Sequence, residues 1–162
     1  IESRGLGDVY KRQREQISPF FNQKLCFSYL EYQRPVSLYT KKSILIDGKE
    51  VVLVSAIASA DLLKEYVDSK ANIIQHFEFR DHYNFKKNDI NKIIDSYNKI
   101  DSLEKLILTT EKDAVRLIHY KNYFKGIDIV YLPVNFKFQG KTNFNELILK
   151  YVEQNRVNSK VS

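Results

Sequence analysis

The stretch that decides the fold is "VVLVSAIA", residues Val51–Ala58, in which apolar side chains follow one another almost without interruption. A strand with one face in water would alternate apolar and polar residues, whereas a continuous apolar run is typical of a strand covered on both faces. Such strands belong to parallel sheets that carry helices on either side. The run therefore predicts a central strand of an α/β sheet.

After this run, segments with helical spacing alternate with further strand-like segments. The expected helices carry the apolar stripes Leu62, Leu63, Tyr66 and Val67; then Ile90, Ile93, Ile94 and Tyr97; then "TEKDAVRLI" from Thr110; and last Phe144, Leu147, Ile148, Tyr151 and Val152. The expected strands are "NIIQHFEF" (72–79), "LEKLILTT" (103–110) and "IDIVYLPV" (127–134). This alternation predicts an α/β fold: a mostly parallel sheet with helices on both faces.

Two extended segments precede the run. "KLCFSYLEY" (24–32) alternates like a strand, and "VSLY" (36–39) is expected to pair with it. We therefore expect a two-stranded β linker within residues 14–46, an α/β domain over 47–154 and a frayed tail over 155–162. Residues 1–13 have no periodicity and resemble a translated library adapter. Since the chain also lacks methionine, we expect a fragment with a non-native start.

Composition limits the function classes. The 162 residues are 43% hydrophobic and 28% charged, which is typical of one globular domain. A single cysteine, Cys26, excludes an internal disulfide and fits a reducing compartment. The formal net charge is +6, but Lys and Arg alternate with acids, and no zinc-ligand spacing or RNP-like motif appears. A lysine-rich solvated surface is therefore favoured over nucleic-acid binding.

Three polar segments follow the expected core strands: "SAIASA", "RDHYNF" and "TTEKDAVR". Since ligands of open α/β sheets gather at the carboxyl ends of the strands, these segments form the candidate site. In the first segment, Ser59 is expected to cap the next helix. In the second, His82 can relay a proton at neutral pH, with Asp81 beside it. A loop histidine bonded to the backbone is the alternative, and His76 and His119 are read as structural.

In the third segment, Thr110 is expected to cap a helix, with Asp113 reaching back to it. Glu111 suits the positive end of the helix dipole, and Lys112 and Arg116 are able to face a phosphate. Helix capping alone is the competing explanation of this motif. No GxxxxGK[ST] or GxGxxG phosphate loop occurs in the 162 residues, so the chain shows no ATP-site motif.

These segments, in this order and spacing, resemble the C-terminal half of the tetraacyldisaccharide 4′-kinase family, the lipid A 4′-kinases of Gram-negative bacteria. The resemblance runs from about Arg14 to Leu149 and rests on "VSAIASADLLKEYV", "HFEFRDHYNFKKNDI", "LILTTEKDAVRL" and "VYLPVNFKF". The combination of "DH", "TEKDAVR" and "YLPV" is specific, although each motif alone is weak.

The resemblance implies a P-loop-type kinase of two α/β domains joined by a two-stranded linker. Such an enzyme transfers the γ-phosphate of MgATP to the 4′-hydroxyl of tetraacyldisaccharide 1-phosphate at the cytoplasmic face of the inner membrane. The phosphate loop and an aspartate base lie in the N-terminal half. This chain is therefore expected to be inactive alone, with ATP and Mg²⁺ bound mainly by that half.

The family pattern "DH" falls on Asp81 and His82, which the resemblance makes the catalytic pair. The cleft-lining residues expected beside them are Ser59, Tyr83, Thr110, Glu111, Lys112, Asp113 and Arg116. The chain departs from the family at Ala56, where a glycine is usual, and at Arg80, where a proline is usual. A stand-alone, non-catalytic α/β binding or interaction module remains the alternative. A phosphate loop in frame upstream would distinguish the two.

Overall fold

The computed structural model describes residues 16–17, 25–139 and 143–158. They belong to two compact units, one of residues 32–135 and the other of the described residues up to Glu31 and from Phe136 onward. The segment expected to be non-native, 1–13, lies outside the described residues, as do residues 159–162.

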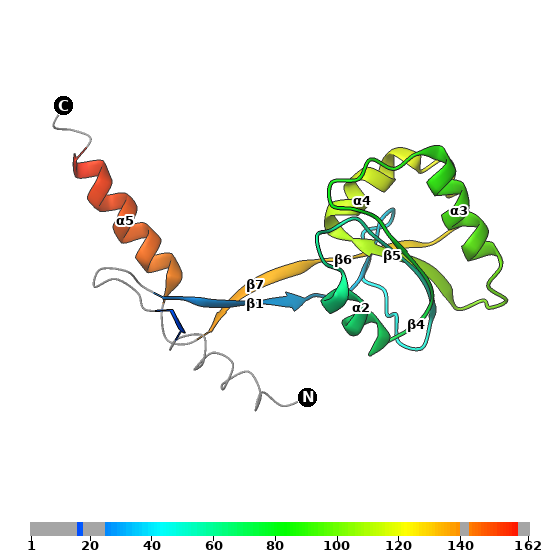
Figure 1. Ribbon diagram of the computed structural model, residues 1–162, viewed down its shortest axis with the longest axis horizontal. Helices are drawn as coiled ribbons and strands as arrows, with labels where there is room; N and C mark the ends of the chain where they lie inside the picture. The colour runs from blue at the N-terminus through cyan, green and yellow to red at the C-terminus, as the bar shows by residue number, and fades with distance from the viewer. Residues whose placement is uncertain (1–15, 18–24, 140–142, 159–162) are drawn as a thin grey trace. The chain divides into compact units, whose positions relative to one another are not determined.

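The larger unit is built on a five-stranded sheet with the order β2-β6-β5-β3-β4. Figure 1 labels three of these strands, β4, β5 and β6. Its strands are β2 (Val36–Ser37), β3 (Glu50–Ser55), β4 (Asn72–Glu78), β5 (Lys105–Thr110) and β6 (Ile129–Leu132). β4, β3, β5 and β6 are parallel, and only the short β2 runs antiparallel, against β6. The mostly parallel sheet predicted from the sequence is confirmed.

Helices cover both faces of this sheet. They are α2 (Asp61–Asp68), α3 (Lys87–Asn98) and α4 (Glu111–Leu117), which continues into a 3₁₀ turn, η1 (Ile118–Tyr120). On one face, α3 and α4 contribute Ile90, Ile93 and Leu117 to a core shared with alternate sheet residues. On the other face, α2 contributes Leu63 and Val67 to a second core. Helical cover on both sides, as predicted, is confirmed.

The position of β3 between two helical layers explains why Val51–Val54 is an unbroken apolar run. Val52 and Val54 point into the core with α3 and α4, whereas Val51 and Leu53 point into the core with α2. All four side chains are fully buried. Successive residues of a strand face opposite sides, so a strand between two helical layers has no face for polar residues.

β3 and β5 define the place where a ligand is expected. They are adjacent and parallel, with Val54 opposite Thr109 near their carboxyl ends. The helix after β3 covers one face of the sheet, and the helix after β5 covers the other. Such a switch point opens a crevice beyond the carboxyl ends of the two strands.

The second unit contains most of a two-stranded sheet of β1 (Phe27–Tyr32) and β7 (Val134–Gln139), followed by α5 (Phe144–Asn158). The stacked rings of Phe138 and Phe144, 4.3 Å apart, join β7 to the start of α5. The apolar stripe expected on α5 stays largely open to solvent, since Tyr151 is 67% exposed. No helix within the described part of the chain is long and apolar enough to cross a bilayer.

Two expectations about strands were wrong. The run "VSLY" does not pair with the strand at 24–32: β2 pairs with β6, and the partner of β1 is β7. The expected strand 127–134 ends at Leu132, because Pro133 cannot donate to a ladder, and Val134 begins a separate strand. The α5 helix also extends through Asn158, so residues 155–158 are helical rather than frayed.

We expect the α4 contact with the core to stabilise the larger unit. Replacing Leu117, which is fully buried, with alanine should lower the free energy of unfolding by about 2–5 kcal/mol, because the lost side chain leaves a cavity. Replacing Val115, which lies on the same helix but is 66% exposed, should change it by less than about 0.5 kcal/mol. Urea unfolding followed by circular dichroism measures both. Equal effects would contradict the packing described here.

Candidate functional site

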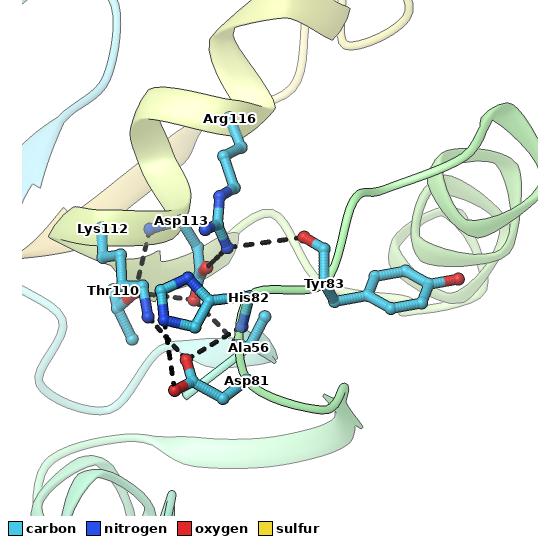
Figure 2. A network of polar contacts seen from close by, with 8 residues as sticks. All are labelled: Ala56, Asp81, His82, Tyr83, Thr110, Lys112, Asp113 and Arg116. Carbon is cyan, nitrogen blue, oxygen red and sulfur yellow. Dashed lines mark hydrogen bonds and ion pairs between the residues drawn. The ribbon is translucent and has the colours of Figure 1, made fainter. Parts of the chain in front are cut away.

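The three polar segments that follow β3, β4 and β5 come together at the carboxyl edge of the sheet (Figure 2). Ala56 follows β3, Asp81 follows β4, and Lys112 and Asp113 lie in the first turn of α4 after β5. Direct contacts join Ala56 to Asp113 and Asp81 to Lys112. Segments far apart in the sequence therefore form one polar network at the switch point.

Asp113 is the buried centre of this network. Its side chain is fully buried, and Oδ2 accepts hydrogen bonds from the backbone N–H of Ala56 at 2.8 Å and from the Thr110 hydroxyl at 2.7 Å. Its other oxygen, Oδ1, lies 3.4 Å from Nη1 of Arg116. A buried carboxylate costs much free energy unless such donors surround it. Asp113 therefore links β3 to α4 and has its oxygens directed at protein donors.

The helix caps are partly as expected. Thr110 is the N-cap of α4, and its hydroxyl oxygen accepts the N–H of Asp113 at 3.1 Å. The Asp113 carboxylate reaches back to the Thr110 hydroxyl and to Ala56, not to the Thr110 backbone. The expectation that Ser59 caps α2 was wrong: the N-cap is Ala60, and the Ser59 hydroxyl donates to Asp61 Oδ2 at 3.1 Å.

The turn after β4 holds a strained residue. Arg80 O accepts the N–H of Tyr83 at 3.2 Å, and between them His82 has φ +59°, in the left-handed region. That conformation costs a residue other than glycine about 1 kcal/mol, although histidine and asparagine adopt it more often than most. Asp81 Oδ1 accepts the N–H of His82 at 2.9 Å and so supports the turn. Backbone strain of this kind is concentrated at functional sites.

Asp81 is paired with a cation from α4. Its Oδ1 lies 2.5 Å from Nζ of Lys112, and each of the two side chains is more than a third exposed. The hydrogen bond from Lys112 lowers the pKa of Asp81 below its ordinary value, and the N–H of His82 lowers it further. The Asp81 carboxylate is therefore ionised at neutral pH.

The His82 ring is the most open group of the site. Its side chain is 76% exposed, and Nε2 lies 3.6 Å from Asp81 Oδ2. The ring is neither packed inside the fold nor withdrawn from the carboxyl edge of the sheet. A group arriving from solvent can reach the imidazole, and Asp81 is close enough to orient it.

Tyr83, expected to line the cleft, contributes its backbone rather than its ring. Its carbonyl oxygen lies 3.4 Å from Nη1 of Arg116. The ring points away from His82 in Figure 2 and stacks on Phe79, with centroids 4.7 Å apart. Its hydroxyl donates to Asp89 at 3.0 Å, and this bond raises the pKa of Tyr83.

Two other expected residues make their contacts elsewhere. Ser59 is exposed, and its hydroxyl is directed at Asp61. Glu111 is exposed and lines a groove of about 270 Å³ together with Lys41, Val115 and Tyr131. The polar network thus contains Asp81, His82, Thr110, Lys112, Asp113 and Arg116, with the backbone of Ala56 and Tyr83.

Sequence reasoning missed two links in this network. It did not predict that the Ala56 N–H binds Asp113 or that Lys112 binds Asp81. Since all four residues follow the carboxyl ends of parallel strands, their proximity was predictable, but the pairing of donors and acceptors was not. His76, interpreted as structural, lies 2.9 Å through Nε2 from the Ser55 hydroxyl, and burial lowers its pKa.

The acidic residues of the network are the candidates for holding a metal ion. Within the ranges that the structure describes, no group of three or more His, Cys, Asp or Glu side chains could hold a metal ion. The Asp81 and Asp113 carboxylates are instead directed at Lys112, at Arg116 and at backbone and hydroxyl donors. These residues do not make a magnesium site by themselves.

Comparison with known proteins relates this geometry to a family. A model of the LpxK family, described as tetraacyldisaccharide-1-P 4′-kinase, matches residues 7–153, a range that begins inside the segment expected to be non-native. A tetraacyldisaccharide 4′-kinase of Bacteroides fragilis is 30% identical over 156 residues, which cover 89% of this chain and 42% of that protein. The enzyme of the same name from Bacteroides thetaiotaomicron is 34% identical, covering 93% and 43%. The chain spans less than half the length of these curated relatives.

A solved structure supports the fold. The crystal structure of LpxK from Aquifex aeolicus, in complex with ATP, matches with a TM-score of 0.50 at 13% identity, covering 90% of this chain and 44% of that one. The family match extends over most of the sequence and includes all three segments of the polar network. The chain therefore belongs to the LpxK family of tetraacyldisaccharide 4′-kinases.

Proposed function

We propose that this chain is the C-terminal part of a kinase that transfers the γ-phosphate of ATP to the 4′-hydroxyl of tetraacyldisaccharide 1-phosphate, a step of lipid A biosynthesis. The family match supports the reaction class. The observation that carries the site is the open Asp81–His82 pair at the carboxyl edge, with Nε2 of His82 3.6 Å from Asp81 Oδ2.

His82 is proposed to act on the proton of the sugar hydroxyl. The hydroxyl oxygen forms a bond to the γ-phosphorus, the bond from that phosphorus to the β–γ bridging oxygen breaks, and ADP leaves. The hydroxyl proton passes to the imidazole, or to a carboxylate from another part of the protein that the imidazole orients. Asp81, kept ionised by Lys112, stabilises the imidazolium that results. Phosphoryl transfer depends mainly on positioning, so an imidazole fixed at a domain edge suits the reaction.

ATP and Mg²⁺ are proposed to bind outside this chain, in the part of the relatives that it does not match. The 162 residues contain no phosphate-loop motif, and the carboxylates of the network are directed at protein donors. When bound, Mg²⁺ would neutralise charge on the transferring phosphate. The N-terminal domain of the same protein is the implied partner of this unit.

The proposed acceptor is an acylated lipid, so the proposed location is the cytoplasmic face of the bacterial inner membrane. The formal net charge of +6 is compatible with an anionic surface. Lys86, Lys87 and Lys92 are exposed on and before α3, where a solvated helix face explains them equally well.

The role of His82 is tested by substitution in the whole open reading frame that contains this chain. His82→Ala should lower kcat by roughly 100-fold, because general acid–base catalysis by one side chain is worth about that much. His82→Asn is the second variant, since asparagine accepts the left-handed backbone and cannot take the proton. Phosphate transfer from labelled ATP to the lipid acceptor measures both.

His119→Ala is the matched control, because His119 is an exposed histidine in η1 outside the network. It should leave kcat unchanged. If His82→Asn keeps full turnover, His82 has no part in the reaction. If the unmodified open reading frame is folded but transfers no phosphate, the non-catalytic module becomes the better explanation of this chain.

A second prediction concerns the 162-residue chain by itself. It should transfer no phosphate to the lipid, because the proposed ATP site lies elsewhere, whereas the whole open reading frame should be active. Transfer by the isolated chain would show that these residues bind ATP and would contradict the proposed division of labour. Scintillation counting of the labelled lipid product compares the two proteins. Circular dichroism confirms that equal amounts of both are folded.

A further inference from the structure

Lys112 joins the exposed turn that carries His82 to the rest of the larger unit. Its Nζ lies 2.5 Å from Asp81 Oδ1, and the same oxygen accepts the N–H of His82 at 2.9 Å. Within the described residues, the contact with Lys112 is the one that connects the Asp81 side chain to another element, the helix α4. The bond to His82 lies within the turn itself.

A second contact holds the other end of this turn. Nη1 of Arg116 lies 3.4 Å from the carbonyl oxygen of Tyr83 and 3.4 Å from Asp113 Oδ1. Asp113 is itself fixed to the end of β3 through the N–H of Ala56. One helix therefore contacts the turn on both sides of His82, and that helix is anchored to the centre of the sheet (Figure 2).

The contacts of Lys112 and Arg116 argue against the expectation that these two cations bind a phosphate. Lys112 faces a carboxylate at ion-pair distance, and Arg116 faces a carboxylate and a carbonyl. A turn that is exposed and holds a residue at φ +59° needs external contacts to keep one conformation. The two side chains supply those contacts.

We propose that Lys112 is a positioning residue: together with Arg116, it fixes the Asp81–His82 turn against α4 and so holds the His82 imidazole in one place. The inference rests on the proposed function for its catalytic consequence, but not for its structural one. An exposed ion pair contributes little to global stability. Its removal should loosen the turn and leave the fold intact.

The kinetic test uses Lys112→Gln and Lys112→Arg in the whole open reading frame. Lys112→Gln should lower kcat by about tenfold or more, because small displacements of a reacting group are costly, while KM for ATP and for the lipid stay within about twofold. Lys112→Arg keeps a cation within reach of Asp81 and should recover most of the turnover. The midpoint of thermal unfolding should be the same in the unmodified protein and in both variants.

Lys99→Gln is the control for charge, since Lys99 is an exposed lysine at the end of α3 outside the network. It should change neither kcat nor KM. A rise in KM for ATP or lipid with kcat unchanged would show that Lys112 binds a substrate phosphate, and would overturn the positioning role. An unchanged kcat in Lys112→Gln would overturn it as well.

A second measurement does not depend on kinase activity. In the 162-residue chain, Lys112→Gln should raise the pKa of Asp81 towards its ordinary value, because the largest cause of its lowering is removed. The backbone amide of His82 should also become more mobile, whereas amides of β3 should not. Carboxyl ¹³C titration and ¹⁵N relaxation measure these effects. If the mobility of the His82 amide is unchanged, the positioning role is refuted, even if the enzyme proves inactive. If the His82 amide becomes mobile but the protein has no kinase activity, only the proposed function is refuted.

Discussion

The candidate site depends on one buried carboxylate. Asp113 buries a carboxyl group inside the fold, and the fold tolerates it because Ala56, Thr110 and Arg116 direct donors at it. Two of these donors come from the α4 segment and one from the end of β3. The Asp113 carboxylate therefore links Thr110, the N-cap of α4, to the end of β3 at the switch point, and the exposed residues of the network are arranged around it.

From this anchor outward, the network becomes more exposed. Asp113 is buried, Arg116 is partly buried, Lys112 and Asp81 are more than a third exposed, and His82 is 76% exposed. This gradient separates two tasks. The inner residues hold geometry, and the outer residue is free to meet another molecule. It also explains why a motif that reads as a helix cap can belong to the candidate site, since the cap residue Thr110 is followed within the same short helix by Lys112 and Arg116, which contact the turn.

The sequence predicted the parts of the fold that depend on local pattern. The apolar run at Val51–Ala58 predicted the central strand β3, although that strand ends at Ser55, and the helical patterns predicted α2, α3 and α4. The prediction failed where distant segments compete for a partner. β1 and β2 were expected to pair with each other, but β1 pairs with β7 and β2 pairs with β6. These two partners are separate strands because Pro133 divides β6 from β7. For the site, the alignment of strand ends brought the right segments together. Sequence periodicity does not predict side-chain orientation. It therefore could not predict the bond between Asp81 and Lys112 or the bond between Ala56 and Asp113.

The order of the strands has a consequence for synthesis of the chain. β3 and β4 are neighbours in sequence and in the sheet, so they are able to pair as soon as both have left the ribosome. β2 is made earlier but pairs with β6, in which Tyr131 lies opposite Val36. The side of β2 that pairs with β6 must therefore wait until nearly the whole unit has emerged, whereas Val36 can bridge Ser43 earlier. A nascent chain of this topology leaves that side of β2 open to chaperones and to wrong partners until late in synthesis.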